Sequence, residues 1–234
     1  MVKKEIVTIS DVIDKSRALY TLLSSEERKE FLKEIIIEPY RHDEMIYEEG
    51  EVPTHILFLY SGKAKIYKNG IANRTQIVRL VNSEDFFGFR DHFANQNYTT
   101  SCSTFEPSII CKIPMTTVNK WVNENPQIAL FFVKKMAAII GQSDERTVNL
   151  TQKHVRGRLA EALILLKNTY GLEHDNATLT ITPSRGDLAN LSNMTTANAI
   201  RTLGAFISER LIIVNGRKIT ILNEDELKNI SRKG

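Results

Sequence analysis

The sequence has 234 residues, of which 42% are hydrophobic and 25% charged, and its formal net charge is +3. This length accommodates two domains with sizeable cores. The sequence has no apolar run of membrane-spanning length, and no charged start followed by an apolar stretch and a cleavage site, so we expect a soluble, cytoplasmic protein.

The first predicted elements are helical. Residues 12–20 favour a helix, and a second helix start follows at Ser24-Ser25-Glu26-Glu27, which leads into Phe31-Leu32. From about Ile35 the hydrophobic period changes to that of strands. These helices therefore precede a region of a different type.

A series of short β-type runs extends from about Ile35 to Phe89, punctuated by turns such as Glu49-Gly50 and Asn69-Gly70. Strands at this short, regular spacing indicate an antiparallel barrel or roll, because alternating strand and helix units would need longer connections. Residues 101–114 are expected to close the roll.

The two cysteines, Cys102 and Cys111, both fall in that closing segment and form no CxxC pair. Two cysteines are fewer than the four ligands of an iron–sulfur cluster, so we expect them to be small buried residues. The five histidines show no HxH or HExxH spacing. Together with the absence of a nucleophile elbow and of a phosphate-binding loop, this predicts no metal, no cofactor and no enzymatic activity.

Asn125-Pro126 is a helix start with proline at the first helical position. The long helix that follows carries apolar residues at helical spacing, and its first half is too apolar for a one-sided surface helix. One interpretation is a dimer seam; the other is a helix packed only on its own roll. A hinge is expected near residues 149–154, followed by a helix over residues 156–171.

Residues 184–207 have the pattern of a helix-turn-helix. Ser184 can cap a first helix, with Asp187 three residues later, and Asn193 stands where the turn needs a left-handed residue. Thr195 then caps a second helix whose inward positions include Leu203 and Phe206. The alternative is an ordinary helical hairpin, whereas the functional interpretation places the second helix in the major groove of DNA.

A β-hairpin is predicted next, because β-prone runs over residues 212–214 and 219–221 flank Asn215-Gly216. Arg217 and Lys218 place two cations near its tip. A helix-turn-helix followed by a basic hairpin is a winged helix, with the wing placed to touch phosphates. Residues 151–234 contain 12 Lys and Arg against 8 Asp and Glu, a net of +4, so the positive excess lies in this part, as a polyanionic partner would require.

Taken in order, the roll, the long helix and the winged helix resemble the Crp/Fnr superfamily of bacterial transcription regulators over nearly the whole chain. The resemblance rests on YRHDEMIYEEGE, LFLYSGKAKIYKNG and FFGF in the roll, and on SRGDLANLSNMTTANAIRTLGAF and NGRKITI in the DNA-binding part. It implies a homodimer in which the roll senses a signal and the winged helix binds a palindromic operator.

The segment that binds cyclic AMP in some members departs from the family pattern here. Gly88 is kept, but Phe89 stands at the ribose-binding glutamate, and Thr99-Thr100 replaces the arginine-serine pair that binds the phosphate. Arg90 is adjacent but is expected to point to the other face of an extended segment. A buried phosphate without a cation is costly, so we expect no cyclic AMP binding of that kind.

Two alternatives remain for this region. One is a pocket for an apolar or neutral effector between the roll and the long helix, near Gly88, Phe89, Thr99, Thr100 and Ser143. The other is that Phe89 and its neighbours fill the space, which would leave a regulator controlled by its own abundance.

The second helix of the helix-turn-helix also departs from the family. Arg201 matches an arginine that reads bases, but Ala197 stands at the position of a glutamate. Arg201 could bond guanine, whereas Ala197 and Ile200 could touch thymine methyls but cannot accept a hydrogen bond from cytosine. We therefore expect an operator unlike those of the well-known branches. The complete set of expected DNA contacts is Arg185, Thr195, Thr196, Ala197, Asn198, Ile200, Arg201, Arg217 and Lys218, of which Arg185, Arg217 and Lys218 are expected at phosphates.

These observations predict an α+β protein with an antiparallel β-roll, a long dimerisation helix and a C-terminal winged helix. The expected domains are residues 1–124, 125–150 and 151–234. The expected function is sequence-specific DNA binding as a homodimer, with RNA polymerase as a candidate partner and no membrane association. The alternative is a ligand-sensing or protein-docking module with a degenerate DNA-binding domain.

Overall fold

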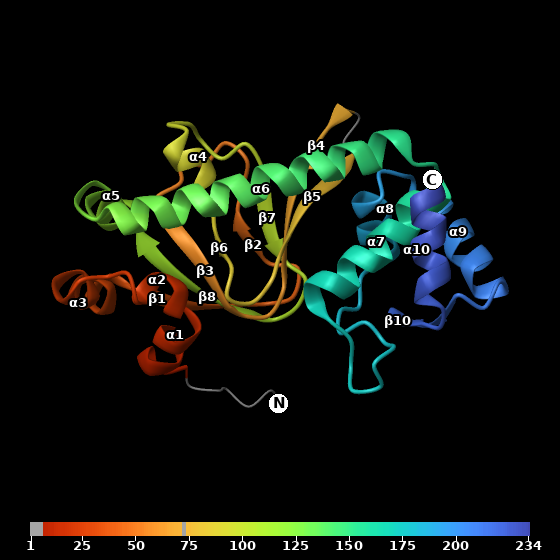
Figure 1. Ribbon diagram of the computed structural model, residues 1–234, viewed down its shortest axis with the longest axis horizontal. Coiled ribbons are helices and arrows are strands. Elements are labelled where there is room, and N and C mark those ends of the chain that lie inside the picture. Colours follow the sequence, from red (N-terminus) through yellow and green to blue (C-terminus); the bar gives the residue numbers. More distant parts are fainter. Residues whose placement is uncertain (1–6, 72–73) are drawn as a thin grey trace. The chain divides into compact units, whose positions relative to one another are not determined.

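The computed structural model describes residues 7–71 and 74–234, and Figure 1 traces their elements along the chain. The chain divides into two compact units, one made of residues 1–65 and 81–139 and the other of residues 66–80 and 140–234. Each unit has its own core. The three domains expected from the sequence, with boundaries after residues 124 and 150, remain a prediction.

Three short helices come first: α1 (Ile9–Lys15), α2 (Arg17–Tyr20) and α3 (Ser25–Glu34). The predicted helix start at Ser24 is confirmed, because its side chain accepts a hydrogen bond from the backbone N–H of Glu27, whose carboxylate accepts one in return from Ser24 N–H. This reciprocal capping satisfies two backbone donors at the start of α3.

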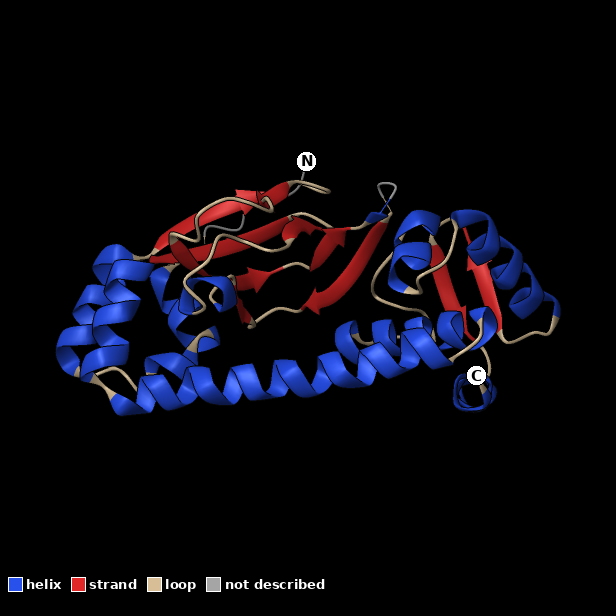
Figure 2. Ribbon diagram, turned by 90° about the horizontal axis from the view of Figure 1, so that it is seen from above, coloured by secondary structure: helices blue, strands red, loops and turns tan. Residues whose placement is uncertain are grey.

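Two four-stranded sheets form the roll, with strand orders β1-β8-β3-β6 and β2-β7-β4-β5. Figure 2 draws the strands in red. In the first sheet every pairing is antiparallel, as is the β2–β7 pairing of the second. The predicted antiparallel roll is therefore confirmed. Its strands are β1 (Ile36–Tyr40), β2 (Met45–Tyr47), β3 (His55–Ser61), β4 (Ala64–Asn69), β5 (Thr75–Val81), β6 (Phe86–Phe87), β7 (Ser101–Thr104) and β8 (Ser108–Pro114).

Two helices in the roll region were not expected from the sequence. The short α4 (Arg90–Phe93) follows β6, and α5 (Met115–Glu124) follows β8. Neither has a side-chain N-cap hydrogen bond. The missing cap removed the signal that marks most helix starts.

The core of the first unit joins strands and helices around Trp121 and Phe31, which stack at 6.5 Å between ring centroids. The indole N–H of Trp121 donates to Glu30 Oε2 at 2.9 Å, so this large side chain is buried with its polar atom satisfied. Cys102 and Cys111 are both fully buried, as predicted, and burial raises the pKa of the Cys111 thiol to about 12.

The long helix α6 (Pro126–Gln152) begins immediately after Asn125, as the Asn-Pro signal predicted. One side of its first half is buried through Ile128 and Phe132. Other α6 side chains are exposed, including Leu130, Val133 and Ile140. Among the described residues, no helix is both long and apolar enough to cross a membrane.

The second unit contains a helical group and a small sheet (Figure 1). The helix α7 packs against α10, α8 and α9, and β9 and β10 form a two-stranded antiparallel sheet. Its elements beyond α6 are α7 (Val155–Tyr170), α8 (Arg185–Leu191), α9 (Thr196–Ser208), β9 (Ile212–Asn215), β10 (Lys218–Ile221) and α10 (Glu224–Lys233).

Candidate nucleic-acid interface

The first helix of the predicted helix-turn-helix is α8, and its start is capped as the sequence indicated. The Ser184 hydroxyl accepts a hydrogen bond from Asp187 N–H at 3.0 Å, and the Asp187 carboxylate accepts one from Ser184 N–H at 3.1 Å. Leu188, Ala189 and Leu191 are buried. This helix is therefore fixed at its N-terminus and packed along one side.

The turn between the two helices contains Asn193 in the left-handed conformation, with φ of 48°. This confirms the role predicted for Asn193, since Asn tolerates that region better than most residues. Ser192 is fully buried, and its hydroxyl has no hydrogen-bond partner within the described chain. An apolar residue would fit this position better, because it would leave no buried hydroxyl without a hydrogen-bond partner.

The second helix, α9, begins at Thr195, whose hydroxyl accepts a hydrogen bond from Asn198 N–H at 3.2 Å. Ala199, Leu203 and Phe206 are buried on its inner side, as predicted. The residues packed inward recur at intervals of four and three, which is the spacing of one helix face.

The outer face of α9 is exposed to solvent. Thr196, Ala197, Arg201 and Ile200 lie on it, and Ile200 is 52% exposed although it is a large apolar residue. Asn198 is half-buried. The arrangement presents a cation, two apolar groups and a hydroxyl on one side of a capped helix, which suits base edges in a major groove.

The predicted hairpin is present as β9 and β10, with Asn215 paired to Lys218. The two-residue loop is therefore Gly216-Arg217. Gly216 has φ of 60°, and Arg217 is not among the residues with positive φ. Glycine at the first loop position is the requirement of a tight hairpin turn, and Arg217 consequently stands at the tip itself.

The three predicted phosphate-binding cations differ in their surroundings. Lys218 forms an ion pair with Glu173 at 2.9 Å, and Arg185 donates from Nη2 to the carbonyl oxygen of Gly216 at 2.9 Å. Arg217 is exposed, and within the described ranges no ion pair is recorded for it. The wing therefore offers the Arg217 guanidinium to a partner, whereas the other two cations already have protein contacts.

Strand β10 of the wing is held by hydrogen bonds from the loop that precedes α8. Leu179 N–H donates to Ile219 O at 2.9 Å, and the hydroxyls of Thr178 and Thr220 lie 2.7 Å apart. Asp175 organises this loop by accepting hydrogen bonds from the Thr178 hydroxyl and backbone N–H. These bonds hold the pKa of the Asp175 carboxyl well below its usual range, at about 2.

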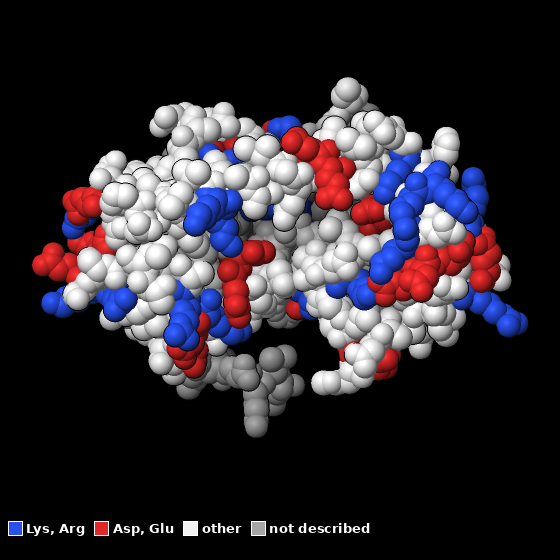
Figure 3. All heavy atoms as spheres, in the orientation of Figure 1, with Lys and Arg blue, Asp and Glu red and all other residues white. Residues whose placement is uncertain are grey.

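On the face drawn in Figure 3, lysine and arginine side chains gather over part of the second unit, beside a patch of aspartate and glutamate. The sequence places the net positive excess in residues 151–234. Positive charge near the winged helix suits a polyanion, and the neighbouring acidic patch restricts where that polyanion can approach.

The residues expected around an effector pocket lie in different surroundings. Gly88 has φ of 77°, and a Cβ there would lie 3.1 Å from Leu57 Cδ1. Phe89 is 1% exposed and packs against Phe93 and Phe132. In the first unit the space at Phe89 is therefore filled by aromatic rings.

The other residues expected around the effector pocket are Thr99, Thr100 and Ser143. Thr99 donates from its hydroxyl to Asp91 Oδ1 at 2.8 Å, Thr100 is buried, and Ser143 lies on the exposed part of α6 in the second unit. A pocket lined by all five residues remains a prediction.

The expectation for Arg90 is wrong. Its Nη2 donates to Asp91 Oδ1 at 3.0 Å and to the hydroxyl of Thr99, so the side chain reaches Thr99. The physical reason is that residues 90–93 form a helical turn, α4, in which side chains do not alternate between two faces. A cation is therefore present near Thr99, and the buried carboxylate of Asp91 is paired with it.

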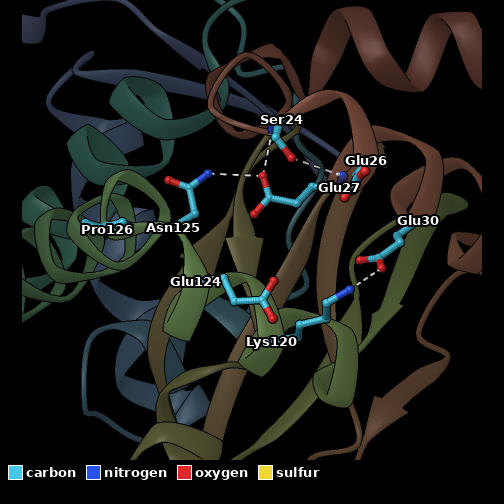
Figure 4. A pocket seen from close by; sticks show the side chains of 8 residues that line it. All are labelled: Ser24, Glu26, Glu27, Glu30, Lys120, Glu124, Asn125 and Pro126. Carbon is cyan, nitrogen blue, oxygen red and sulfur yellow. Dashed lines mark hydrogen bonds and ion pairs between the residues drawn. The ribbon is translucent and has the colours of Figure 1, made fainter.

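A different hollow, of about 300 Å³, lies between α3 and the start of α6 (Figure 4). Two of its carboxylates have partners within the hollow: Glu30 pairs with Lys120, and Glu27 Oε2 accepts a hydrogen bond from Asn125 Nδ2 at 3.1 Å. The residues that line it are Ser24, Glu26, Glu27, Glu30, Lys120, Glu124, Asn125 and Pro126. No cluster of three or more potential metal ligands occurs among the described residues.

Two family descriptions match the chain. Residues 37–125 match the cyclic nucleotide-binding domain, and residues 157–230 match the Crp-like helix-turn-helix domain. The chain is 27% identical over 190 residues to the regulatory protein HlyX of Actinobacillus pleuropneumoniae, covering 81% of this chain and 79% of that protein. It is 26% identical over 196 residues to the fumarate and nitrate reduction regulatory protein of Vibrio cholerae, covering 82% and 77%.

Solved structures show the same fold. FixK2 from Bradyrhizobium japonicum superposes with a TM-score of 0.75 at 20% identity, covering 84% of this chain and 96% of that one. A Crp/Fnr-family structure from Eubacterium rectale superposes with a TM-score of 0.78 at 17% identity, covering 92% and 97%. These likenesses confirm the order of roll, long helix and C-terminal helical domain.

Proposed function

We propose that this chain, which belongs to the Crp/Fnr family and is a DNA-binding transcription regulator, reads a palindromic operator as a homodimer. The observation that carries the proposal is the outer face of α9. Its N-terminal cap is formed, its inner side is buried, and Thr196, Ala197, Ile200 and Arg201 are exposed together. A helix of this kind fits the major groove with its first turns at base edges.

The residues on that face indicate which bases are read. The Arg201 guanidinium can donate two hydrogen bonds to guanine O6 and N7. Ala197 and Ile200 offer only apolar contact, which suits thymine methyl groups, and neither accepts a hydrogen bond from the amino group of cytosine. The proposed operator therefore differs from that of relatives with a glutamate at the position of Ala197.

Selection from randomised double-stranded DNA with the purified chain tests this proposal. We expect enrichment of a palindrome whose half-sites lie about 34–36 Å apart, one helical turn centre to centre. Arg201→Ala should relax the preference for one guanine in each half-site and cost about 1–3 kcal/mol per contact. Gel-shift titration against the selected site and single-base variants measures both effects.

Arg232→Ala is the matched control, since it removes one exposed arginine of α10 outside the helix-turn-helix. It should leave base preference unchanged. Recovery of the operator common to the glutamate-containing relatives would contradict the proposed reading of Ala197. Failure to enrich any sequence would favour the ligand-sensing or protein-docking alternative.

The proposal of a homodimer rests on α6. Leu130, Val133, Ala137 and Ile140 are exposed and spaced by three, four and three residues; we call these four residues the α6 stripe. This spacing is the a/d repeat by which two helices pack along each other. A two-fold dimer also matches a palindromic site. We also propose that the protein binds DNA without catalysing a reaction, acts in the cytoplasm and contacts RNA polymerase.

We propose further that cyclic AMP does not control this regulator. Phe89 stands in the core at the place of the ribose-binding glutamate, and a phosphate at Thr99 would meet the carboxylate of Asp91, which already pairs with Arg90. Displacing that pair would leave a buried charge unpaired, which is costly. Calorimetric titration with cyclic AMP should give no heat of binding, and micromolar affinity would refute this part of the proposal.

A further inference from the structure

Arg185 is the first residue of α8, and its side chain contacts the tip of the wing. Its Nη2 donates to the carbonyl oxygen of Gly216 at 2.9 Å. Its Nη1 is shielded from solvent and has no partner within the described chain. A guanidinium held in this way against the protein does not extend toward a phosphate outside it.

The carbonyl that Arg185 binds lies in the loop of the hairpin. Gly216 and Arg217 stand between the last paired residues, Asn215 and Lys218, so the Gly216 carbonyl lies outside the four residue pairs of β9 and β10. A hairpin with two four-residue strands is only marginally stable by itself. Arg185 supplies the loop with a charge-assisted hydrogen bond, one of the stronger kinds.

The contact between Arg185 and Gly216 also bears on where Arg217 lies relative to α9. Arg217, next to Gly216, is the wing cation offered to solvent, while α8 packs directly against α9. A bond from α8 to the wing loop therefore holds Arg217 in place relative to the exposed face of α9. The loop at residues 177–179 supports β10, and Arg185 supports the opposite end of the hairpin.

We infer that Arg185 is a positioning residue, which holds the wing so that Arg217 contacts a phosphate while α9 occupies the groove. This replaces the direct phosphate contact expected for Arg185 from the sequence. The inference rests on the proposed function. It predicts that Arg185 contributes to DNA affinity only through Arg217.

A double-mutant cycle on the selected operator tests this dependence. Arg217→Ala should reduce the slope of log K against log salt by about 0.9 per phosphate contact, hence by about 1.8 for the two subunits of a dimer. Arg185→Ala added to Arg217→Ala should change the slope no further and the affinity by no more than about twofold. A second loss of about 1.8 in slope would show that Arg185 itself contacts a phosphate, and would overturn the inference.

Amide hydrogen exchange in the DNA-free protein provides the second measurement. Arg185→Ala should speed exchange of the wing amides, residues 212–221, roughly tenfold, and leave residues 196–208 of α9 unchanged. Unchanged wing exchange would overturn the inference. Arg232→Ala serves as the control for loss of one charge in both experiments. If the wild-type chain selects no operator, the proposed function fails, and wing exchange still decides whether Arg185 holds the wing.

Discussion

Gly204 occupies an interior position of α9 where the protein itself gives no reason for glycine. It is exposed, and a Cβ built there would meet no atom within 4 Å. It lies seven residues after Ala197, which places both on the same face of the helix. Glycine in a helix interior is destabilising by about 0.5–1 kcal/mol relative to alanine. A surface that approaches α9 closely from outside would account for it.

Gly204→Ala should therefore have opposite effects on stability and on binding. We expect the free energy of unfolding to rise by about 0.5–1 kcal/mol, because the helix gains propensity and the methyl group meets open space. The same methyl should weaken operator binding by obstructing the groove. Urea denaturation and gel-shift titration measure the two changes. The gain in stability excludes misfolding as the cause of weaker binding, and unchanged affinity would show that DNA does not approach Gly204.

Individual residues were predictable where their role depends on near neighbours in the sequence. The caps at Ser184 and Thr195 follow from hydroxyls that accept a hydrogen bond from a backbone N–H three residues away, and the left-handed Asn193 follows from the tolerance of Asn for that conformation. Arg90 was not predictable in this way. Its contact with Thr99 depends on a helical turn, and on an approach of two segments that no local pattern records.

At the scale of elements, predictability followed the strength of the local signals. The helix α6 was anticipated from Asn125-Pro126 and a long apolar period. The helix α5 was missed because Thr116, Thr117 and Val118 are β-branched and favour strands, and because Pro114 provides no side-chain cap. The signal that could have identified it is the recurrence of apolar residues every three positions, at Met115, Val118 and Trp121, which the structure shows to be buried.

The wing shows how a correct motif leaves its register undetermined. Asn215-Gly216 predicted a hairpin, and the pairing of Asn215 with Lys218 makes Gly216-Arg217 the loop. Which dipeptide forms the loop depends on the side chains that the flanking strands bury. Ile212, Ile219 and Ile221 are the buried ones here. The loop is thus Gly216-Arg217 and not Asn215-Gly216. This shift by one residue places Arg217 at the tip and the Gly216 carbonyl within reach of Arg185.

For the whole molecule, the order of elements was sufficient to predict the fold class. Antiparallel sheets followed by a long helix and a winged helix leave few alternatives, and the excess of lysine and arginine after residue 150 marked the unit that binds DNA. In the structure of a single chain, an interface between subunits is visible only as a set of exposed residues. In the proposed homodimer, the α6 stripe is the surface along which the two chains would pack.

Its four members are Leu130, Val133, Ala137 and Ile140; of these Val133 is 62% exposed and Ile140 is 61% exposed, values unusual for β-branched apolar side chains on a long helix. The burial of Ile128 and Phe132 shows that another side of α6 already packs on the core of the first unit. Within one subunit, the side chains of the stripe are therefore left largely in contact with solvent. A second copy of α6 would bury it by knobs-into-holes packing.

Val133→Asp should convert the protein to a monomer, because a carboxylate in that seam would have to be desolvated without a partner. The monomer should bind one half-site with less than the dimer's affinity for the full operator, since its two DNA-binding domains are no longer joined in one dimer.

Ala138→Asp is the matched control: it introduces the same charge at an exposed α6 position outside the stripe, roughly a third of a turn away. Sedimentation velocity and gel-shift titration with full and half operators measure both properties. A Val133→Asp variant that sediments as a dimer would place the two-fold contact elsewhere, and loss of operator affinity in a protein that stays dimeric would mean that α6 affects DNA binding by another route.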